Sequence, residues 1–111
     1  MIEMKIVEKP WGREIWWALT DRYVGKILEV KAGHSLSLQY HEKKHETMML
    51  YEGQARMELD GKSFPMPYRE GVVIEPNQKH RIVAVTDVTI FEVSTPETED
   101  VVRIEDAYGR V

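Results

Sequence analysis

Hydrophobic and polar positions alternate along much of this chain, in short runs rich in Val, Ile, Tyr and Trp that are separated by turn residues. Successive side chains of a strand point to opposite faces, so this pattern is typical of a β-sandwich or β-barrel. It predicts an all-β fold. The expected strands lie near Arg13–Ala18, Tyr23–Val30, Leu36–Tyr40, Met48–Glu52, Ala55–Leu59, Gly71–Ile74, Arg81–Val85 and Val88–Val93.

Turn signals separate these runs. Asp60-Gly61 predicts a two-residue type I′ hairpin, because both central positions need a positive φ. Ala32-Gly33 and Glu52-Gly53 mark two further turns. The prolines within Phe64–Pro67 indicate an edge strand or a connection, since proline cannot donate to a central ladder. The acidic stretch Glu97–Asp100 after a proline is a candidate helix start.

The length of 111 residues, without repeats or a linker, predicts one domain over residues 1–111. We expect a short N-terminal arm over about 1–11 and a C-terminal arm over about 97–111. A domain of this size buries a smaller fraction of its surface than a larger one. Pairing of two copies would improve that burial, so we expect a homodimer.

Charge and composition exclude several classes of function. The net charge is −4, both signs are interspersed, and there is no basic run, which disfavours binding to nucleic acid or to an anionic membrane. No cysteine is present, so disulfides and thiolate ligands are excluded. The start of the chain is charged where a signal peptide needs an apolar core, and no apolar stretch reaches the length of a membrane span. We expect a cytoplasmic protein.

Four polar residues are candidate ligands of one metal ion. Gln39 and His41 are two apart on an expected strand and therefore share a face, Glu46 returns on the next strand, and His80 starts another. Two imidazoles, an amide oxygen and a carboxylate suit a divalent ion, zinc first, with Mn, Fe, Co or Ni as alternatives. His45 is an alternative ligand, although the strand-and-loop setting favours Glu46.

Two segments that contain these ligands resemble the cupin superfamily, which implies a double-stranded β-helix, or jelly-roll, barrel. They contain Gly33, Gln39, His41, Glu46 and Gly53, followed by Gly71, Pro76 and His80. Gln39 stands where cupins usually have their first histidine. A Gln-His-Glu-His set is the one that mannose-6-phosphate isomerases use.

Further segments extend the resemblance over nearly the whole chain. In order they are Lys9–Gly12, Lys26–Val30, Leu36–His41, Lys79–Ile82, Phe91–Val93 and Val101–Arg110. Together they are similar to the type II mannose-6-phosphate isomerase domain, which commonly forms the C-terminus of bifunctional enzymes with a mannose-1-phosphate guanylyltransferase. Three residues before His80, Asn77 replaces the usual glycine. Asparagine tolerates a left-handed backbone, so we expect that turn to be retained.

The resemblance implies aldose–ketose interconversion of a phosphorylated sugar through an enediolate that a divalent ion stabilises. The base that moves the C2 proton would be Glu92 or Lys26, both in matching segments. Ser37 shares the strand face of Gln39 and could contact a sugar hydroxyl. Each of these residues could instead be ordinary surface.

The substrate phosphate needs cations, and the planar fork of arginine binds two oxygens at once. Arg103 is the first candidate and Lys26 the second, although Arg103 could equally form an ion pair with Glu105 or Asp106. Arg81 should point to the face opposite His80 and have a structural role.

Two functions of other classes remain open on the sequence. One is another metal-dependent cupin enzyme, such as a dioxygenase, because this fold supports many chemistries. The other is a non-catalytic sugar-binding module. The aromatic residues Trp11, Trp16 and Trp17 could line a sugar-binding mouth, but packing in the core or in a dimer interface is the preferred interpretation. The remaining histidine, His34, follows a turn glycine and is expected to be a hydrogen-bonding residue.

Overall fold

The computed structural model of the protein describes residues 3–111 and confirms the all-β prediction. Strands account for the regular structure of these residues, and no helix occurs among them. In order the strands are β1 (Lys5–Lys9), β2 (Gly12–Leu19), β3 (Val24–Val30), β4 (Leu38–Tyr40), β5 (Glu46–Glu52), β6 (Ala55–Leu59), β7 (Lys62–Pro65), β8 (Gly71–Ile74), β9 (His80–Ala84), β10 (Val88–Ser94) and β11 (Val102–Glu105). Consequently, residues 3–111 contain no helix long and apolar enough to cross a membrane.

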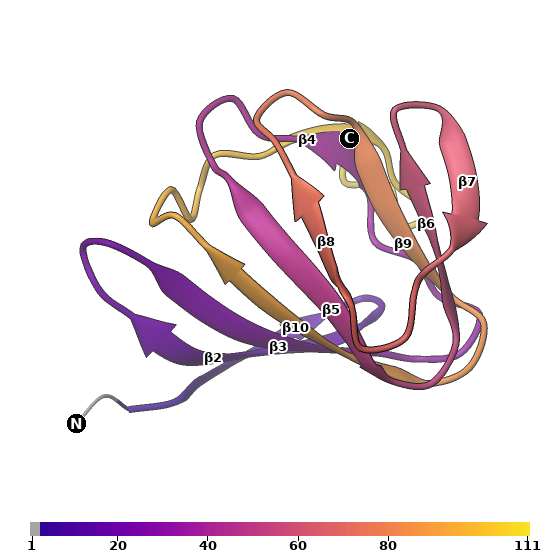
Figure 1. Ribbon diagram of the computed structural model, residues 1–111, viewed down its shortest axis with the longest axis horizontal. Helices are drawn as coiled ribbons and strands as arrows, with labels where there is room; N and C mark the ends of the chain where they lie inside the picture. Colours follow the sequence, from indigo (N-terminus) through magenta and orange to yellow (C-terminus); the bar gives the residue numbers. More distant parts are fainter. Residues whose placement is uncertain (1–2) are drawn as a thin grey trace.

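The strands form two antiparallel sheets that face each other (Figure 1). One sheet has the order β1-β2-β3-β10-β5-β8, and the other has the order β11-β4-β9-β6-β7. Apolar side chains from both sheets meet between them and form the core. Its most deeply buried members are Leu28, Val30, Met48, Met57, Ile74, Ile82 and Ile90. Burial of this apolar area supplies the main driving force for closing one sheet on the other.

The turn chemistry read from the sequence is confirmed. Asp60 and Gly61 have φ values of 48° and 82°, as a type I′ hairpin requires, and Asn77 has a φ of 69°. The strand that ends at Pro65, β7, lies at the edge of its sheet. There the missing N–H of proline interrupts no ladder.

The helix start expected at Glu97–Asp100 is wrong. Thr98 and Glu99 form a turn, and the chain continues directly into β11. The carboxylate of Asp100 does not cap a helix: it accepts hydrogen bonds from the backbone N–H groups of Glu42, Lys43 and Lys44, at 3.1, 2.7 and 3.0 Å. The Asp100 carboxylate, which could have capped a helix N-terminus, is therefore occupied by the backbone N–H groups of residues 42–44.

Both of the expected terminal arms contain strands. Residues 5–9 form β1 and pair with β2, and residues 102–105 form β11 and pair with β4. Residues 1 and 2 of the expected N-terminal arm lie outside the described residues. These two strands bring Lys9 and Arg103 to the interior of the barrel.

Strand register sets which side chains share the inner face. Across the larger sheet, Trp16, Lys26, Glu92 and Met48 are successive Cα partners on β2, β3, β10 and β5. Across the smaller sheet, Arg103, Gln39 and His80 are successive partners on β11, β4 and β9. Directly opposed residues lie on the same face of a sheet, so the register assembles two polar rows from segments far apart in sequence.

Candidate metal centre and adjoining cavity

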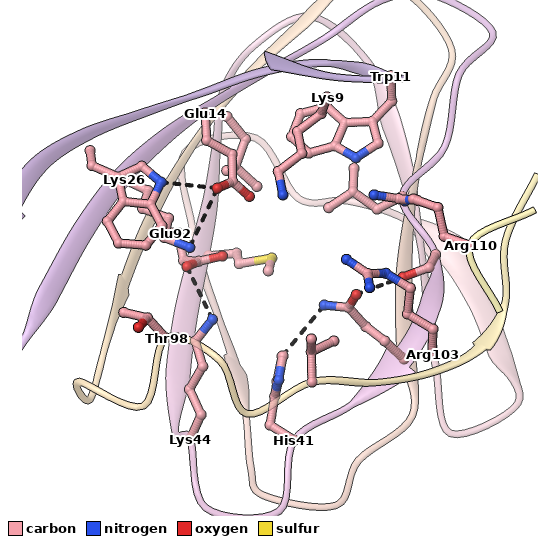
Figure 2. Close-up of a pocket in the computed structure, with 17 residues that line it drawn as sticks. Lys9, Trp11, Glu14, Lys26, His41, Lys44, Glu92, Thr98, Arg103 and Arg110 are labelled. Carbon is pink, nitrogen blue, oxygen red and sulfur yellow. Dashed lines mark hydrogen bonds and ion pairs between the residues drawn. The ribbon is translucent and has the colours of Figure 1, made fainter. Parts of the chain in front are cut away.

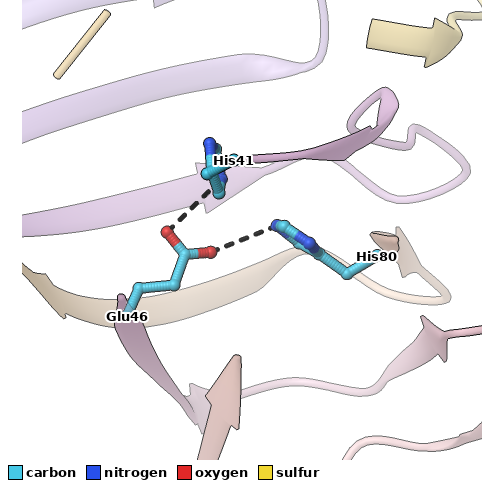
Figure 3. Close-up of side chains that lie close together, drawn as sticks. All are labelled: His41, Glu46 and His80. Atoms are coloured by element: carbon cyan, nitrogen blue, oxygen red, sulfur yellow. Dashed lines mark ion pairs between the residues drawn. The ribbon is translucent and has the colours of Figure 1, made fainter. Parts of the chain in front are cut away.

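Three of the four proposed ligands converge in the barrel. One ligand atom from each of His41, Glu46 and His80 lies within 4.8 Å of the others, and all three residues are buried (Figure 3). The Nε2 atom of His41 is 3.7 Å from Glu46 Oε2, and the Nε2 atom of His80 is 3.2 Å from Glu46 Oε1. The strands β5 and β9 begin at Glu46 and His80, and His41 directly follows β4.

The orientation of both imidazoles suits a metal ion. Each ring uses Nδ1 to donate a hydrogen bond to a backbone carbonyl, His41 to Asp100 and His80 to Gln78. A neutral ring with its proton on Nδ1 presents the Nε2 lone pair, here toward a carboxylate. Among residues 3–111, His80 Nε2 and Glu46 Oε1 are buried without a hydrogen-bond partner. Lone pairs of nitrogen and oxygen that face each other in a buried site can be satisfied by a shared cation. The hydrogen bonds from Nδ1 to backbone carbonyls also give both rings the orientation typical of metal-binding histidines.

Electrostatics keep His41 and Glu46 in the protonation states that metal ligands need. Burial lowers the pKa of His41 below its usual 6.5, although the charge of Glu46 opposes this shift. Burial alone would raise the pKa of Glu46, but contact with His80 and the charge of Lys44 outweigh it and hold the pKa at about 2. Near neutral pH the site therefore offers a neutral His41 and an ionised Glu46.

The fourth proposed ligand, Gln39, lies beside His41. Its Nε2 atom is 3.5 Å from His41 Nε2, and its Oε1 atom accepts a hydrogen bond of 2.6 Å from Ser37 Oγ. In this orientation the amide presents nitrogen, not oxygen, toward the imidazole. A half-turn of the amide would present Oε1 there, and the Ser37 hydroxyl could accept from Nε2 as readily as it now donates. The expectation that Ser37 shares the face of Gln39 is confirmed.

Lys44 is buried next to the candidate ligands, although the adjacent Glu42 and Lys43 are exposed. Its Nζ atom lies 2.9 Å from Glu46 Oε2 and 3.4 Å from Glu92 Oε2. Burial would lower the pKa of Lys44, but the charges of Glu92 and Glu46 raise it, so the ammonium stays charged. Lys44 thus contacts both Glu46 of the candidate ligand group and Glu92 on the inner face of the larger sheet.

A cavity of about 130 Å³ adjoins the ligands and contains the remaining candidates (Figure 2). Glu92 is buried at its wall, where burial and then the charge of Glu46 raise its pKa above the usual value. Lys26 lies with Nζ 3.6 Å from Glu14 Oε1 and 4.1 Å from the ring centre of Trp16. Trp16 Nε1 donates to the same Glu14 oxygen, at 3.0 Å.

The other aromatic and basic candidates differ in whether they line the cavity. Trp11 is in the core and also lines the cavity, whereas Trp17 is 45% exposed on the outside. Arg81 points away from His80 and pairs with Glu58, so its structural interpretation is confirmed. Arg103 lines the cavity. The alternative ion pair is absent among residues 3–111, because Asp106 pairs with Arg110.

Neither of the other two histidines belongs to the ligand group. His34 Nδ1 is 2.7 Å from the Tyr108 hydroxyl, as expected of a hydrogen-bonding residue. The His45 side chain is half exposed, and its Nε2 atom lies 3.3 Å from Glu75 Oε2. It points out of the barrel, so the alternative assignment of His45 as a ligand is wrong.

Four charged cavity residues were absent from the sequence-based candidates for substrate or base: Lys9, Glu14, Lys44 and Arg110. Alternation on β2 could have indicated Glu14, because it shares a face with Trp16, the Cα partner of Lys26. No local signal distinguishes Lys44 from its exposed neighbour Lys43. Lys9 and Arg110 reach the cavity only through the packing of the two ends of the chain.

Two facing antiparallel sheets with a histidine–glutamate–histidine group between them give this protein the cupin fold. An RmlC-like cupin from Shewanella frigidimarina superposes with a TM-score of 0.77, covering 88% of each chain at 14% identity. KdgF from Halomonas sp. gives a TM-score of 0.76 at 18% identity, covering 89% of this chain and 92% of KdgF. At these identities the likeness shows the fold alone.

The family is established by sequence. The model of the family described as "Mannose-6-phosphate isomerase C-terminal" matches residues 2–106, and the chain therefore belongs to that family. The mannose-1-phosphate guanylyltransferase ManC of Salmonella typhimurium is 31% identical over 110 residues, or 95% of this chain. The alginate biosynthesis protein AlgA of Pseudomonas aeruginosa is 30% identical over 109 residues, or 94% of this chain. The chain spans 23% of the length of each relative.

Proposed function

We propose that this cupin binds a divalent metal ion and interconverts an aldose phosphate and a ketose phosphate, with mannose 6-phosphate as the substrate to test first. One observation carries the proposal: two buried imidazoles present Nε2 to Glu46 directly beside a cavity that contains a buried carboxylate and several cations. Membership of the mannose-6-phosphate isomerase C-terminal family supports the choice of reaction.

His41, Glu46 and His80 would hold the ion, with Gln39 as a fourth ligand after its amide turns. Zinc fits this set of nitrogen and oxygen donors first, and Mn, Fe, Co or Ni also accept it. A bound divalent cation supplies Lewis-acid stabilisation of the negative charge that develops on the two substrate oxygens. Ser37 would contribute by orienting Gln39 through its hydrogen bond.

Glu92 is the stronger of the two candidate bases. It is buried at the cavity wall, and its raised pKa brings the carboxylate closer to the pKa that proton transfer near neutral pH requires. The carboxylate would accept the C2 proton and return it to C1, while the hydroxyl proton on O2 moves to O1, so that the C1 aldehyde becomes a hydroxyl and C2 becomes the carbonyl. Lys26 contacts both Glu14 and the Trp16 ring, an arrangement that suits orientation of Glu92, its Cα partner across the sheet.

An assay of metal-loaded protein with mannose 6-phosphate, following the appearance of fructose 6-phosphate, tests the proposal. We expect turnover in the wild type and in Glu75→Gln, which alters an exposed carboxylate outside the cavity. Glu46→Gln should lose at least about 100-fold in activity and in metal content, because it removes the charged ligand. Wild-type turnover no greater than that of a Gln39/His41 double variant would refute the isomerase.

A sugar-binding module without catalysis is the second candidate, and the position of Lys44 favours it. Its ammonium contacts both Glu46 and Glu92, so it already compensates both carboxylates without an ion. Phosphorylated sugars should then raise the melting temperature without being converted. A dioxygenase, by contrast, would require bound iron and oxygen uptake, which metal analysis and an oxygen electrode measure directly.

We also propose that two copies associate through the outer face of the larger sheet. Ile6, Ile15, Ile27, Phe91 and Met49 are successive Cα partners across β1, β2, β3, β10 and β5. This apolar row faces outward, since the alternate residues of the same strands are the buried ones. A contiguous apolar patch on a small domain is typical of an interface.

A further inference from the structure

The charge of the cavity differs in sign from that of the chain. Its lining includes five cationic side chains and two carboxylates, although the chain as a whole has a net charge of −4. The cations are Lys9, Lys26, Lys44, Arg103 and Arg110, and the carboxylates are Glu14 and Glu92. A cavity lined by one sign of charge concentrates ligands of the opposite sign.

Three of the five cations already have carboxylate partners. Lys26 pairs with Glu14, and Lys44 pairs with Glu46 and Glu92. Arg110 donates to both oxygens of Asp106, from Nε at 2.8 Å and from Nη2 at 2.9 Å. These pairs neutralise most of the positive charge on their own side of the cavity.

Lys9 and Arg103 are different. Within residues 3–111, neither has a carboxylate oxygen within 4.0 Å of its charged nitrogens. The Nε atom of Arg103 is buried and has no hydrogen-bond partner among the same residues. A buried guanidinium donor without an acceptor is costly, so its presence at a cavity wall points to an anionic ligand.

The two residues are placed by the strands at the two ends of the chain. Arg103 is the Cα partner of Gln39, at the edge of the smaller sheet, and Lys9 is the last residue of β1 in the larger sheet. Figure 2 shows both side chains directed into the cavity, on the side where Arg110 also lies, with Glu92, Lys26 and Lys44 on the other side.

We infer that Lys9 and Arg103 form an anion subsite that takes the phosphate monoester of the substrate. Arginine provides paired N–H donors to two phosphate oxygens and lysine adds a compact charge, while the Asp106-bound guanidinium of Arg110 lies on the same side. Lys26, the other phosphate candidate, is already committed to Glu14. With the phosphate on this side, the carbonyl end of the sugar points toward His41 and Glu92.

The test is titration of metal-free protein with inorganic phosphate, followed by calorimetry or by NMR shifts. Without metal, phosphate binding reports on the side chains alone. We expect Arg103→Gln to weaken phosphate binding about 10- to 100-fold and Lys9→Met about tenfold, as loss of charged hydrogen bonds predicts. Arg56→Gln and Lys62→Met, which remove exposed cations outside the cavity, should stay within about twofold of the wild type.

The inference is overturned if the wild type does not bind phosphate at millimolar concentration, or if both cavity variants bind it as the controls do. Urea unfolding of each variant separates lost binding from lost folding, and Arg103→Lys should recover part of the affinity. The sugar class in this inference rests on the proposed function, but the phosphate titration does not. Phosphate binding without isomerase turnover would support the subsite and refute the isomerase. Turnover without phosphate binding would support the isomerase and refute the subsite.

Discussion

Two rows on opposite faces of the larger sheet differ in character, although the same four of its six strands carry both. On the inner face, Trp16, Lys26, Glu92 and Met48 lie side by side across β2, β3, β10 and β5. The row on the outer face consists of the sequence neighbours of these residues on the same strands: Ile15, Ile27, Phe91 and Met49. An isolated sandwich usually has its apolar face inside and its polar face in water.

These two rows depart from that pattern, whereas Leu28, Val30 and Ile90 keep the rest of the inner face apolar. Buried charges are tolerated only when they are paired, and the inner row meets that condition through Glu14, Lys44 and Glu46. The outer row leaves apolar side chains partly exposed, and the proposed contact between two copies would cover them. The proposed site inside and the proposed interface outside would account for both departures. Three experiments, ordered by their expected effect on the free energy of unfolding, test this comparison.

The largest effect is expected at Lys44. In metal-free protein, Lys44→Met should destabilise the fold by about 3–5 kcal/mol, because Glu46 and Glu92 lose the cation between them. The same substitution should raise affinity for a divalent ion about tenfold or more, since a positive charge next to a ligand oxygen repels the ion. Urea denaturation and metal titration measure the two opposite effects.

The matched control is Lys43→Met, which alters the adjacent lysine, whose side chain is exposed. It should change neither the unfolding midpoint nor the metal affinity measurably. If the Lys44 and Lys43 variants have the same stability and metal affinity, the stability of the fold does not depend on the charge pairs of the inner row.

An intermediate effect is expected from acid. The pKa of Glu46 is lowered to about 2 from 4.5, so its ionised form stabilises the fold above pH 4.5, and this contribution is lost as the pH falls from 4.5 toward 2. Its size is at most about 3 kcal/mol in metal-free protein. Glu92 acts with the opposite sign: its raised pKa gives a contribution that is present below pH 4.5 and lost as the pH rises.

Urea denaturation of metal-free protein across this pH range measures the acid effect. Glu46→Gln should flatten the fall in stability between pH 4.5 and 2, whereas Glu75→Gln should leave it unchanged, because Glu75 is exposed. An equally steep fall in Glu46→Gln would assign the acid sensitivity to other carboxylates, such as Asp106 beside Arg110.

The smallest effect on the fold is expected on the outer face. Phe91→Asp places a charge within the apolar row, between Ile27 and Met49, and should convert a dimer to a monomer in light scattering. Unfolding of the monomer should change by no more than about 1–2 kcal/mol, because the side chain is only partly buried. Thr89→Asp, on the same face of β10 beside this row, is the control. A monomeric wild type would contradict the proposed interface.

Much of the fold could be predicted from local pattern. Alternation located the longer strands to within a few residues, and turn chemistry identified Asp60-Gly61 and Asn77 correctly. Strands β1 and β11 were treated as arms, and the segment of β7 was left open as an edge strand or a connection. They are short, or lie at an edge, and are stabilised by pairing with distant partners more than by a strong pattern of their own.

The candidate metal centre was predicted largely by motif. The spacing of His41 and Glu46, with His80 in a second segment, indicated three groups that the structure does bring together. The amide orientation of Gln39 could not be predicted, because its hydroxyl partner accepts either one. The role of Lys44 also needed the structure, since Lys43 and Lys44 look equivalent in a polar loop.

By itself the sequence determined the all-β class, the main strands and the candidate ligand residues, because side-chain alternation and motif spacing are local properties of the chain. Only the tertiary structure decided which charges meet. The pairing of Lys44 with two carboxylates, the position of Lys9 and Arg103 across one cavity and the apolar outer row all depend on register between strands far apart in sequence. Register is selected by the global fit of the two sheets, which no single segment encodes.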